Sequence, residues 1–206
     1  FCRRVVRQFA VRGVAVTGIT ISPAQFEFAE QRIARAGLSD LVEIRLCDYR
    51  DVEESFDHVV SIEMIEAVGE TYWPVYFDRI ARCVRRGGRV AIQAITTSDE
   101  HFAHYRRRAD FIQTYIFPGG MLPCRSALRE QAHRVGLKWL QDDGFAPHYA
   151  RTLGEWREKF IASWPRIRTM GFDERFRRLW EFYLASCEGS FRARGIDVLQ
   201  IALVKS

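Results

Sequence analysis

The first half of the chain alternates short, β-branched apolar runs with amphipathic helical patterns, and only brief turns separate them. Strands are expected at residues 14–20, 42–47, 56–63 and 89–96, and helices at residues 24–36 and 72–85. The helical patterns end at Gly37 and at the pair Gly87 and Gly88, and glycine commonly follows the last turn of a helix. Strands and helices that alternate over short loops form βαβ units. The sequence therefore predicts an α/β fold with a mostly parallel sheet and helices on both faces.

The second half of the chain has a different character. Residues 101–115 are basic and aromatic, residues 115–123 predict a rigid loop, and Asp142, Asp143 and Gly144 predict an acidic turn. Helices are expected at residues 126–135, 153–167 and 173–194, strands at 137–141 and 196–204, and residues 2–11 also have helical spacing. A chain of 206 residues can bury one core but not two ordinary ones. Residues 1–206 are thus expected to form one domain, with a helical insertion before the last strand.

Composition excludes some classes of protein and leaves others open. No run approaches the roughly 18 apolar residues of a membrane-spanning helix. The five cysteines are scattered and lack CxxC spacing, which argues against a disulfide framework or a zinc site and fits a reducing cytoplasm. The formal net charge is +5, with arginine clusters at residues 3–4, 106–108 and 175–178. Such clusters are usually solvated, and the functional alternatives are nucleic acid and an anionic bilayer.

Two carboxylates, Glu63 and Glu66, follow the strand expected at residues 56–63 and lie among apolar neighbours. The carboxyl end of a buried strand is where an α/β enzyme keeps its site. A desolvated carboxylate needs a hydrogen-bond partner, a cation or a catalytic task. The alternative is that both side chains cap the following helix, which Glu70 and Thr71 would begin. Their position favours the functional interpretation.

Several short motifs occur in a specific order along the chain. They are Thr17–Ser22 with Gln25, Asp48–Asp51, Ser61–Gly69, Tyr115–Pro123, His148–Tyr149 with Thr152–Leu153, and Cys187 with Phe191–Arg194 and Ile196–Asp197. As an ordered set, they resemble the cyclopropane-fatty-acyl-phospholipid synthase family of S-adenosylmethionine-dependent methyltransferases, which includes the mycolic-acid cyclopropane synthases. The resemblance runs from about residue 14 to the end and implies a Rossmann-like class I methyltransferase fold.

The resemblance implies a binding site for S-adenosylmethionine. The implied cofactor-binding residues are Thr20, Ile21, Ser22 and Gln25 on the ribose and adenine side, Asp48 and Tyr49 beside the adenine, and Ile62. The residues from Thr20 to Gln25 follow one predicted strand, and Asp48 and Tyr49 follow the adjacent one. A nucleoside crevice forms at such strand ends. For Thr20 and Ser22, ordinary helix capping is the alternative interpretation.

The resemblance implies a cis double bond in the acyl chain of a membrane phospholipid as the methyl acceptor. An alkene has no proton to remove before attack, so the enzyme must align it with the methyl group in a dry channel. The resulting carbocation must then lose a proton, and family members hold a bicarbonate ion for that step. Here the implied catalytic residues are Glu66, Tyr149 and Ile95, the last through its backbone. Tyr149 could instead be a core aromatic whose hydroxyl finds a partner.

The sequence departs from the family pattern at positions that concern proton removal. Gln93 stands where better-known members carry His, Glu63 stands in place of Gly, and Ala67 in place of a second His. A glutamine can donate a hydrogen bond but cannot titrate near neutral pH. We therefore expect methyl transfer to the alkene, with a methylene- or methyl-branched chain as an alternative product to the cyclopropane ring.

Cys187 occupies a position that family descriptions mark as an active-site residue. We expect it to be a wall of the site and not a nucleophile, because alkene methylation needs no covalent enzyme adduct. Phe117, Leu153 and Phe191 resemble the lining of the acyl channel, although each could be ordinary core. Residues 101–125 and 150–195 are expected to cover the acyl chain.

The family's first strand and Gly-rich loop have no counterpart in this sequence. Because such a loop approaches the cofactor closely, we expect the chain alone to bind the cofactor poorly and to expose a sheet edge. Two other functions stay open, namely a methyltransferase for a soluble small molecule and an inactive lipid-binding fragment. The resemblance further implies a bacterial cytoplasmic protein, peripheral at the inner membrane face, with no metal and no nucleic-acid partner, and it allows a homodimer.

Overall fold

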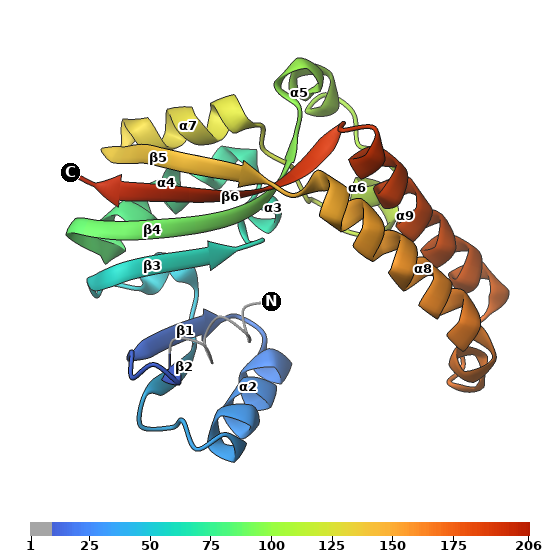
Figure 1. The fold of residues 1–206 in the computed structure, drawn as a ribbon, viewed down its shortest axis with the longest axis horizontal. Helices are drawn as coiled ribbons and strands as arrows, with labels where there is room; N and C mark the ends of the chain where they lie inside the picture. Colours follow the sequence, from blue (N-terminus) through green and yellow to red (C-terminus); the bar gives the residue numbers. More distant parts are fainter. Residues whose placement is uncertain (1–9) are drawn as a thin grey trace.

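The computed structural model describes residues 10–206, and its elements follow the predicted order (Figure 1). The strands are β1 (Val16–Thr20), β2 (Val42–Leu46), β3 (Phe56–Ile62), β4 (Val84–Thr97), β5 (Leu137–Gly144) and β6 (Ile196–Lys205). The helices are α2 (Pro23–Arg35), α3 (Ile65–Val68), α4 (Trp73–Cys83), α5 (Asp99–Tyr105), α6 (Phe111–Tyr115), α7 (Arg125–Arg134), α8 (Ala146–Thr169) and α9 (Glu174–Arg192). The helix expected at residues 2–11 lies outside the described residues, apart from its last two.

The expected α/β architecture is confirmed, but the larger sheet is mixed. Its order is β3-β4-β6-β5, and β1 and β2 form a separate parallel pair. β3 runs parallel to β4, whereas β6 runs antiparallel to both β4 and β5. The chain leaves α9 beside the carboxyl end of β4, where the N–H of Ser98 donates to the carbonyl of Gly195 at 3.1 Å. β6 must therefore run back along β4, which the alternation of elements did not predict.

β4 is longer than expected and α4 is shorter. The helix ends at Cys83, and Gly87 and Gly88 lie inside β4 rather than at a helix end. A Cβ atom on Gly88 would lie 2.5 Å from the carbonyl oxygen of Asp57. Only glycine allows β3 and β4 to approach so closely here, at a place where their register shifts.

β5 and α8 also extend beyond their expected ranges. β5 continues through residues 142–144, where the sequence predicts an acidic turn, because partners on α7 and on β5 itself satisfy the buried Asp142 carboxylate. It accepts hydrogen bonds at 2.9 Å from the guanidinium of Arg125 and from the indole N–H of Trp139. α8 begins at Ala146, so Tyr149 lies on a helix.

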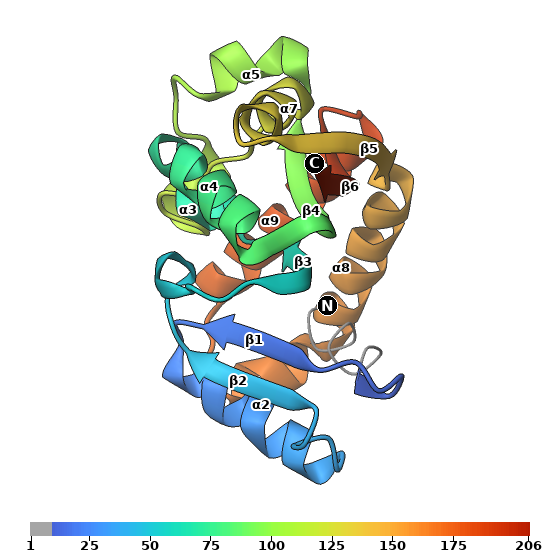
Figure 2. The same ribbon diagram turned by 90° about the vertical axis from the view of Figure 1, so that its left-hand side faces the viewer.

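Apolar packing forms two clusters. The larger joins α4 and α7 to one face of the four-stranded sheet, with fully buried members such as Tyr76, Phe77, Ile92, Leu128 and Leu203. The smaller joins α8 and α9 to β6, through Leu153, Leu184, Phe191 and Val198. The α8–α9 hairpin extends from the end of the sheet at which β3 and β4 finish (Figure 1). Figure 2 shows α4 on one side of β3 and β4 and α8 on the other.

β1 and β3 each pair with a single strand among the described residues, so both present an open edge. Two apolar side chains on these strands, Ile19 and Val60, are 38% and 43% exposed. The exposed sheet edge expected from the sequence is thus present within residues 10–206. Unpaired N–H and C=O groups on such an edge are able to pair with another strand.

Candidate active site

The chain turns sharply where β3 ends. The backbone N–H of Glu63 donates to the carbonyl of Gln93 on β4 at 2.8 Å, and Glu63 then takes a left-handed conformation with φ of 49°. The turn leads into the short helix α3, which carries Glu66 in its first turn. Both carboxylates therefore lie at the carboxyl end of β3, as the sequence predicts.

The carboxylate of Glu66 is buried behind the ends of β3 and β4. Its Oε1 accepts a 2.6 Å hydrogen bond from the backbone N–H of Ile95, whereas Oε2 has no hydrogen-bond partner within residues 10–206. Burial raises the pKa of Glu66 from its ordinary value of 4.5 to about 7; the Ile95 N–H opposes this rise, and the nearby Glu63 adds to it. A carboxyl poised near neutral pH with one free oxygen is suited to hold a polar ligand or to move a proton.

Neither carboxylate caps the helix that follows. The Glu66 side chain binds Ile95, and the Glu63 side chain binds Gln93. α4 begins after Tyr72 without any side-chain hydrogen bond at its N-cap. The capping alternative is therefore wrong.

Glu63, Gln93 and Tyr149 form a triangle of hydrogen bonds. Oε1 of Glu63 accepts from Nε2 of Gln93 at 2.8 Å and from the Tyr149 hydroxyl at 3.1 Å, and the same Nε2 donates to the Tyr149 oxygen at 3.1 Å. Gln200 on β6 donates to Oε1 of Gln93 at 2.9 Å, which orients the Gln93 amide toward Glu63. Burial and the negative Glu63 raise the pKa of Tyr149, so its hydroxyl stays protonated and available as a donor.

The structure thus brings together most of the catalytic residues expected from the sequence. Two departures from the family pattern, at Glu63 and Gln93, contact each other directly. Gln200 was not predicted, although a single amide between the apolar residues Leu199 and Ile201 of β6 was a usable signal. Gln93 is 5% exposed, and a buried amide requires partners such as these.

Thr20, Ser22 and Gln25 lie together just beyond β1. The Thr20 hydroxyl donates to Oε1 of Gln25 at 3.0 Å and accepts from the N–H of Ser22 at 3.2 Å. Oγ of Ser22 accepts from the N–H of Gln25 at 3.3 Å, so Ser22 is the N-cap of α2 and its capping interpretation is confirmed. Ile21 is 75% exposed. These hydroxyl and amide groups can exchange hydrogen bonds with ribose hydroxyls.

Asp48 lies beside this group because β1 and β2 run parallel. The N–H of Cys47 donates to the carbonyl of Thr20 at 2.9 Å, which holds the two strand ends together. The guanidinium of Arg50 binds the Asp48 carboxylate through two hydrogen bonds, at 2.9 and 2.8 Å, and lowers the pKa of Asp48. The donor and acceptor set at this edge fits a nucleoside.

Tyr49 follows β2, and its side chain packs against a residue that contacts the end of β3. Its ring packs edge-on against Tyr76 of α4, with 6.0 Å between the ring centroids. The Tyr76 hydroxyl donates to the hydroxyl of Ser61 at 2.7 Å, next to Ile62, the last residue of β3. Tyr49 is half-buried, and burial raises its pKa.

The residues expected to line an acyl channel lie in two environments. Leu153 and Phe191 are buried in the α8–α9 cluster, where the Phe191 ring packs against Tyr149 at 5.5 Å between centroids. Phe117 is 56% exposed in the loop after α6, and its ring meets Tyr183 edge-on at 6.2 Å. The channel itself stays a prediction.

Cys187 is half-buried on α9, among the residues packed against the smaller core cluster. Burial raises the pKa of its thiol from 9.0 to about 11. The nucleophilic form of cysteine is the thiolate, and a thiol with this pKa is neutral at physiological pH. This environment supports the expectation that Cys187 is a wall and not a reagent.

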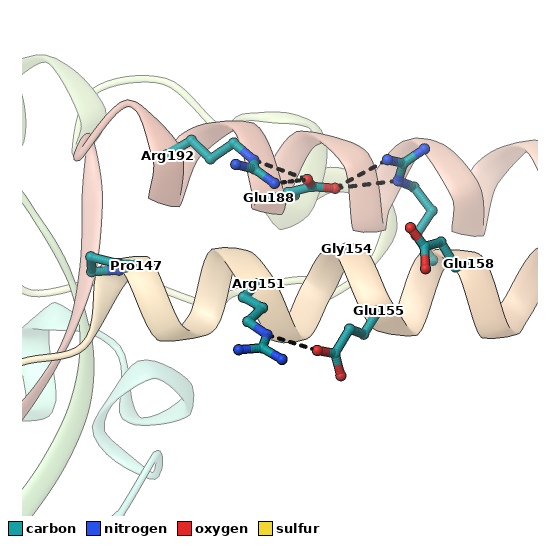
Figure 3. Close-up of a pocket in the computed structure, with 8 residues that line it drawn as sticks. Pro147, Arg151, Gly154, Glu155, Glu158, Glu188 and Arg192 are labelled. Atoms are coloured by element: carbon teal, nitrogen blue, oxygen red, sulfur yellow. Dashed lines mark hydrogen bonds and ion pairs between the residues drawn. The ribbon is translucent and has the colours of Figure 1, made fainter.

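A hollow of about 550 Å³ lies between α8 and α9, and its walls are charged (Figure 3). Glu188 bridges two arginines there, Arg157 at 3.3 Å and Arg192 at 2.8 Å. A Cβ on Gly154 would lie 3.3 Å from Oε1 of Glu188, so the small residue makes room for this carboxylate. Charges paired in this way link the two helices, and they are unsuited to an apolar acyl chain.

The sequence matches the family described as Mycolic acid cyclopropane synthetase over residues 1–201. It is 46% identical over 197 residues to the tuberculostearic acid methyltransferase UfaA1 of Mycobacterium tuberculosis (strain ATCC 25618 / H37Rv), covering 95% of this chain and 46% of that protein. It is 36% identical over 190 residues to the cyclopropane-fatty-acyl-phospholipid synthase of Escherichia coli (strain K12), covering 91% and 47% respectively. The chain spans about half the length of the curated relatives it matches.

A solved structure of the mycolic acid cyclopropane synthase CmaA1, complexed with SAH and CTAB, is 27% identical and superposes with a TM-score of 0.86, covering 97% of this chain and 73% of that chain. This likeness confirms the expected class I methyltransferase fold. The family match extends over nearly the whole sequence, so the chain belongs to the mycolic acid cyclopropane synthetase family of S-adenosylmethionine-dependent methyltransferases.

Proposed function

We propose that the protein transfers a methyl group from S-adenosylmethionine to the cis double bond of an unsaturated acyl chain of a membrane phospholipid. The observation that carries this proposal is the Glu66 carboxylate, which is buried at the carboxyl end of β3 with a pKa near 7 and one free oxygen. Membership of the family supplies the reaction class, and the named relatives are fatty acid methyltransferases and cyclopropane synthases.

Residues at the ends of β1 and β2 would hold the methyl donor. Thr20 and Gln25 offer hydroxyl and amide groups for the ribose, and Asp48 offers an acceptor for nucleoside N–H or O–H groups. The SAH bound in the solved relative supports this assignment. When bound, the donor supplies an electrophilic methyl group on a sulfonium.

The residues at the end of β3 and their partners would act after methyl transfer. At that point the acyl chain carries a carbocation that must lose a proton. The free Oε2 of Glu66 fits a hydrogen bond to an oxyanion placed beside it. That oxyanion is either the bicarbonate ion that the family resemblance implies or a carboxylate side chain of this protein. Tyr149 and Gln93 supply neutral donors at the same place.

We propose a methylene- or methyl-branched acyl chain as a product, beside or instead of the cyclopropane ring. The relative named for tuberculostearic acid is 46% identical, compared with 36% for the cyclopropane synthase of Escherichia coli. Gln93 also cannot titrate as a histidine would at the same position. Both observations favour an arrangement of proton removal that differs from that of ring formation.

We further propose that the protein works peripherally at the inner face of the membrane. The tip of the α8–α9 hairpin exposes two large apolar side chains, Met170 (68%) and Phe172 (41%), beside the exposed Arg168 and Arg175. Apolar side chains flanked by arginine are suited to an anionic bilayer surface. No helix within residues 10–206 combines the length and the apolar character needed to cross a bilayer. A homodimer stays a prediction.

The test uses the protein with any sequence that precedes Phe1 in its gene. The protein is incubated with S-adenosylmethionine carrying a deuterated methyl group and with vesicles of dioleoyl phospholipid. Mass spectrometry should find the label in the acyl chains, and NMR then separates a ring CH₂ from an exocyclic methylene. Label in an added soluble acceptor, with none in the lipid, would favour the small-molecule methyltransferase. Absence of all transfer despite SAH binding would refute the proposed activity.

A further inference from the structure

We propose that the carboxylate of Glu63 is the proton acceptor of this reaction, so that the chain needs no bound bicarbonate. The inference rests on the proposed function and deepens it, because it assigns the final step at the same site to a residue of the chain. It starts from the position of Glu63, at the end of β3 and hydrogen bonded to Gln93 and Tyr149.

Neutral donors hold the Glu63 carboxylate in place. Oε1 receives the hydrogen bonds from Gln93 and Tyr149, and within residues 10–206 no arginine, lysine or histidine forms an ion pair with Glu63. A cationic partner would favour the charged form and weaken the base. In the same part of the chain Oε2 takes no part in a hydrogen bond, which leaves this oxygen for the proton.

The other polar groups of the cluster are poorer acceptors. Gln93 has no titratable group, and its amide is already fixed by Gln200 at 2.9 Å. Tyr149 stays protonated because burial and Glu63 raise its pKa. Burial also favours the protonated form of Glu66, whose Oε1 is held by Ile95. Glu66 is therefore less suited than Glu63 to accept the proton.

The backbone gives an independent argument. Glu63 has a φ of 49°, in the left-handed region that glycine enters without strain. A residue with a Cβ is strained in that region, and such strain commonly persists at functional sites. Glu63 is exposed, so a captured proton has a route to solvent.

The step balances without a further reactant. The π electrons of the alkene form the new carbon–carbon bond to the methyl group, and the methyl–sulfur bond breaks with its electrons left on sulfur. The acyl chain now carries a cation. For ring closure, Oε2 of Glu63 takes a proton from the transferred methyl group, and the C–H electron pair bonds that carbon to the neighbouring cationic carbon. For an exocyclic methylene, the hydrogen of the methylated carbon first shifts with its electron pair to the cationic carbon. Oε2 then takes a proton from the methyl group, and the C–H electron pair forms the new double bond. The proton then passes from Glu63 to water.

Two variants test this assignment. Glu63→Gln retains an oxygen that accepts from Gln93 and Tyr149 but removes the base, so methyl transfer should fall at least about 100-fold. SAH affinity measured by calorimetry should stay within about twofold, because the donor-binding residues are untouched. Glu63→Gly removes the carboxylate and also relieves the left-handed strain. Its activity should be rescued at least about tenfold by added bicarbonate, and it should bind ¹³C-bicarbonate in an NMR titration.

The wild-type protein is expected to ignore bicarbonate in both measurements. Dependence of the wild type on bicarbonate, or a Glu63→Gln variant within about threefold of the wild-type rate, would overturn the inference while leaving the proposed function intact. If the wild type methylates no lipid, the proposed function fails. The bicarbonate titration of the wild type and Glu63→Gly then still decides whether Glu63 occupies the oxyanion position.

Discussion

Replacing Glu66 by glutamine should stabilise the protein at alkaline pH while impairing the reaction. Glutamine keeps an oxygen for the Ile95 N–H and has nearly the same volume, but it carries no charge to desolvate. In the wild type, the buried carboxylate must ionise as the pH passes its raised pKa of about 7. The variant avoids this charge altogether.

The magnitude follows from the pKa. A carboxyl group whose pKa rises from 4.5 to about 7 on folding destabilises the ionised folded state by about 3 kcal/mol. The folded state binds the proton more tightly, so this contribution to the free energy of unfolding is fully present below pH 4.5. It is lost as the pH rises through about 7. The difference between Glu66→Gln and wild type should therefore grow by about 3 kcal/mol from pH 4 to pH 8.

Urea unfolding at pH 4, 6 and 8 measures this difference. Other carboxylates contribute equally to both proteins and cancel in the comparison. Glu30→Gln, at an exposed position of α2, is the matched control for the same substitution away from the site. If the stability of Glu66→Gln runs parallel to that of the wild type across this range, the buried, proton-binding Glu66 described above is refuted.

Three other variants test neighbouring parts of the site and its cover. Tyr149→Phe removes a hydrogen-bond donor to the Glu63 carboxylate, so methyl transfer should slow by about 10- to 100-fold while SAH affinity stays the same. An unchanged rate would mean that Tyr149 takes no part in the reaction. Cys187→Ser should stay within about fivefold of the wild-type rate, because the thiol is neutral at physiological pH. Complete loss of methyl transfer would mean that Cys187 is a reactive group after all. Glu188→Ala should lower the free energy of unfolding by about 1 kcal/mol in urea, a modest value because both arginine partners reach solvent; no change would mean that this bridge does not stabilise the α8–α9 hairpin.

The order and type of the elements could be predicted because strand and helix patterns are local. A strand buries alternate residues and a helix buries every third or fourth, and these periods are visible within one segment. The direction of β6 is not local, because it depends on where the preceding hairpin returns the chain to the sheet. The same holds for β5, whose acidic residues are compatible with a strand only because Arg125 and Trp139 meet Asp142.

The site was predictable residue by residue but not as a set of contacts. Glu66, Ile95 and Tyr149 follow from the family pattern, and Gln93 marks a departure from it. The hydrogen bond from the Ile95 N–H to Glu66 was not predicted. The bond between Glu63 and Gln93 depends on the register of β3 and β4, in which Ile62 lies opposite Gln93. Register is a property of paired strands, so the sequence could mark these positions as unusual without placing them in contact.

Two unfavourable features of this chain lie at the end of β3, and they allow function to be separated from architecture. Glu63 occupies a strained backbone conformation, and Glu66 has a buried oxygen without a partner within residues 10–206. A structural role predicts that removing either feature lowers stability. A catalytic role predicts the reverse, namely that Glu63→Gly and Glu66→Gln fold at least as stably at pH 8 and yet lose methyl transfer when no bicarbonate is added. Stability and activity that change in opposite directions at both positions would mean that the end of β3 is shaped by chemistry rather than by packing.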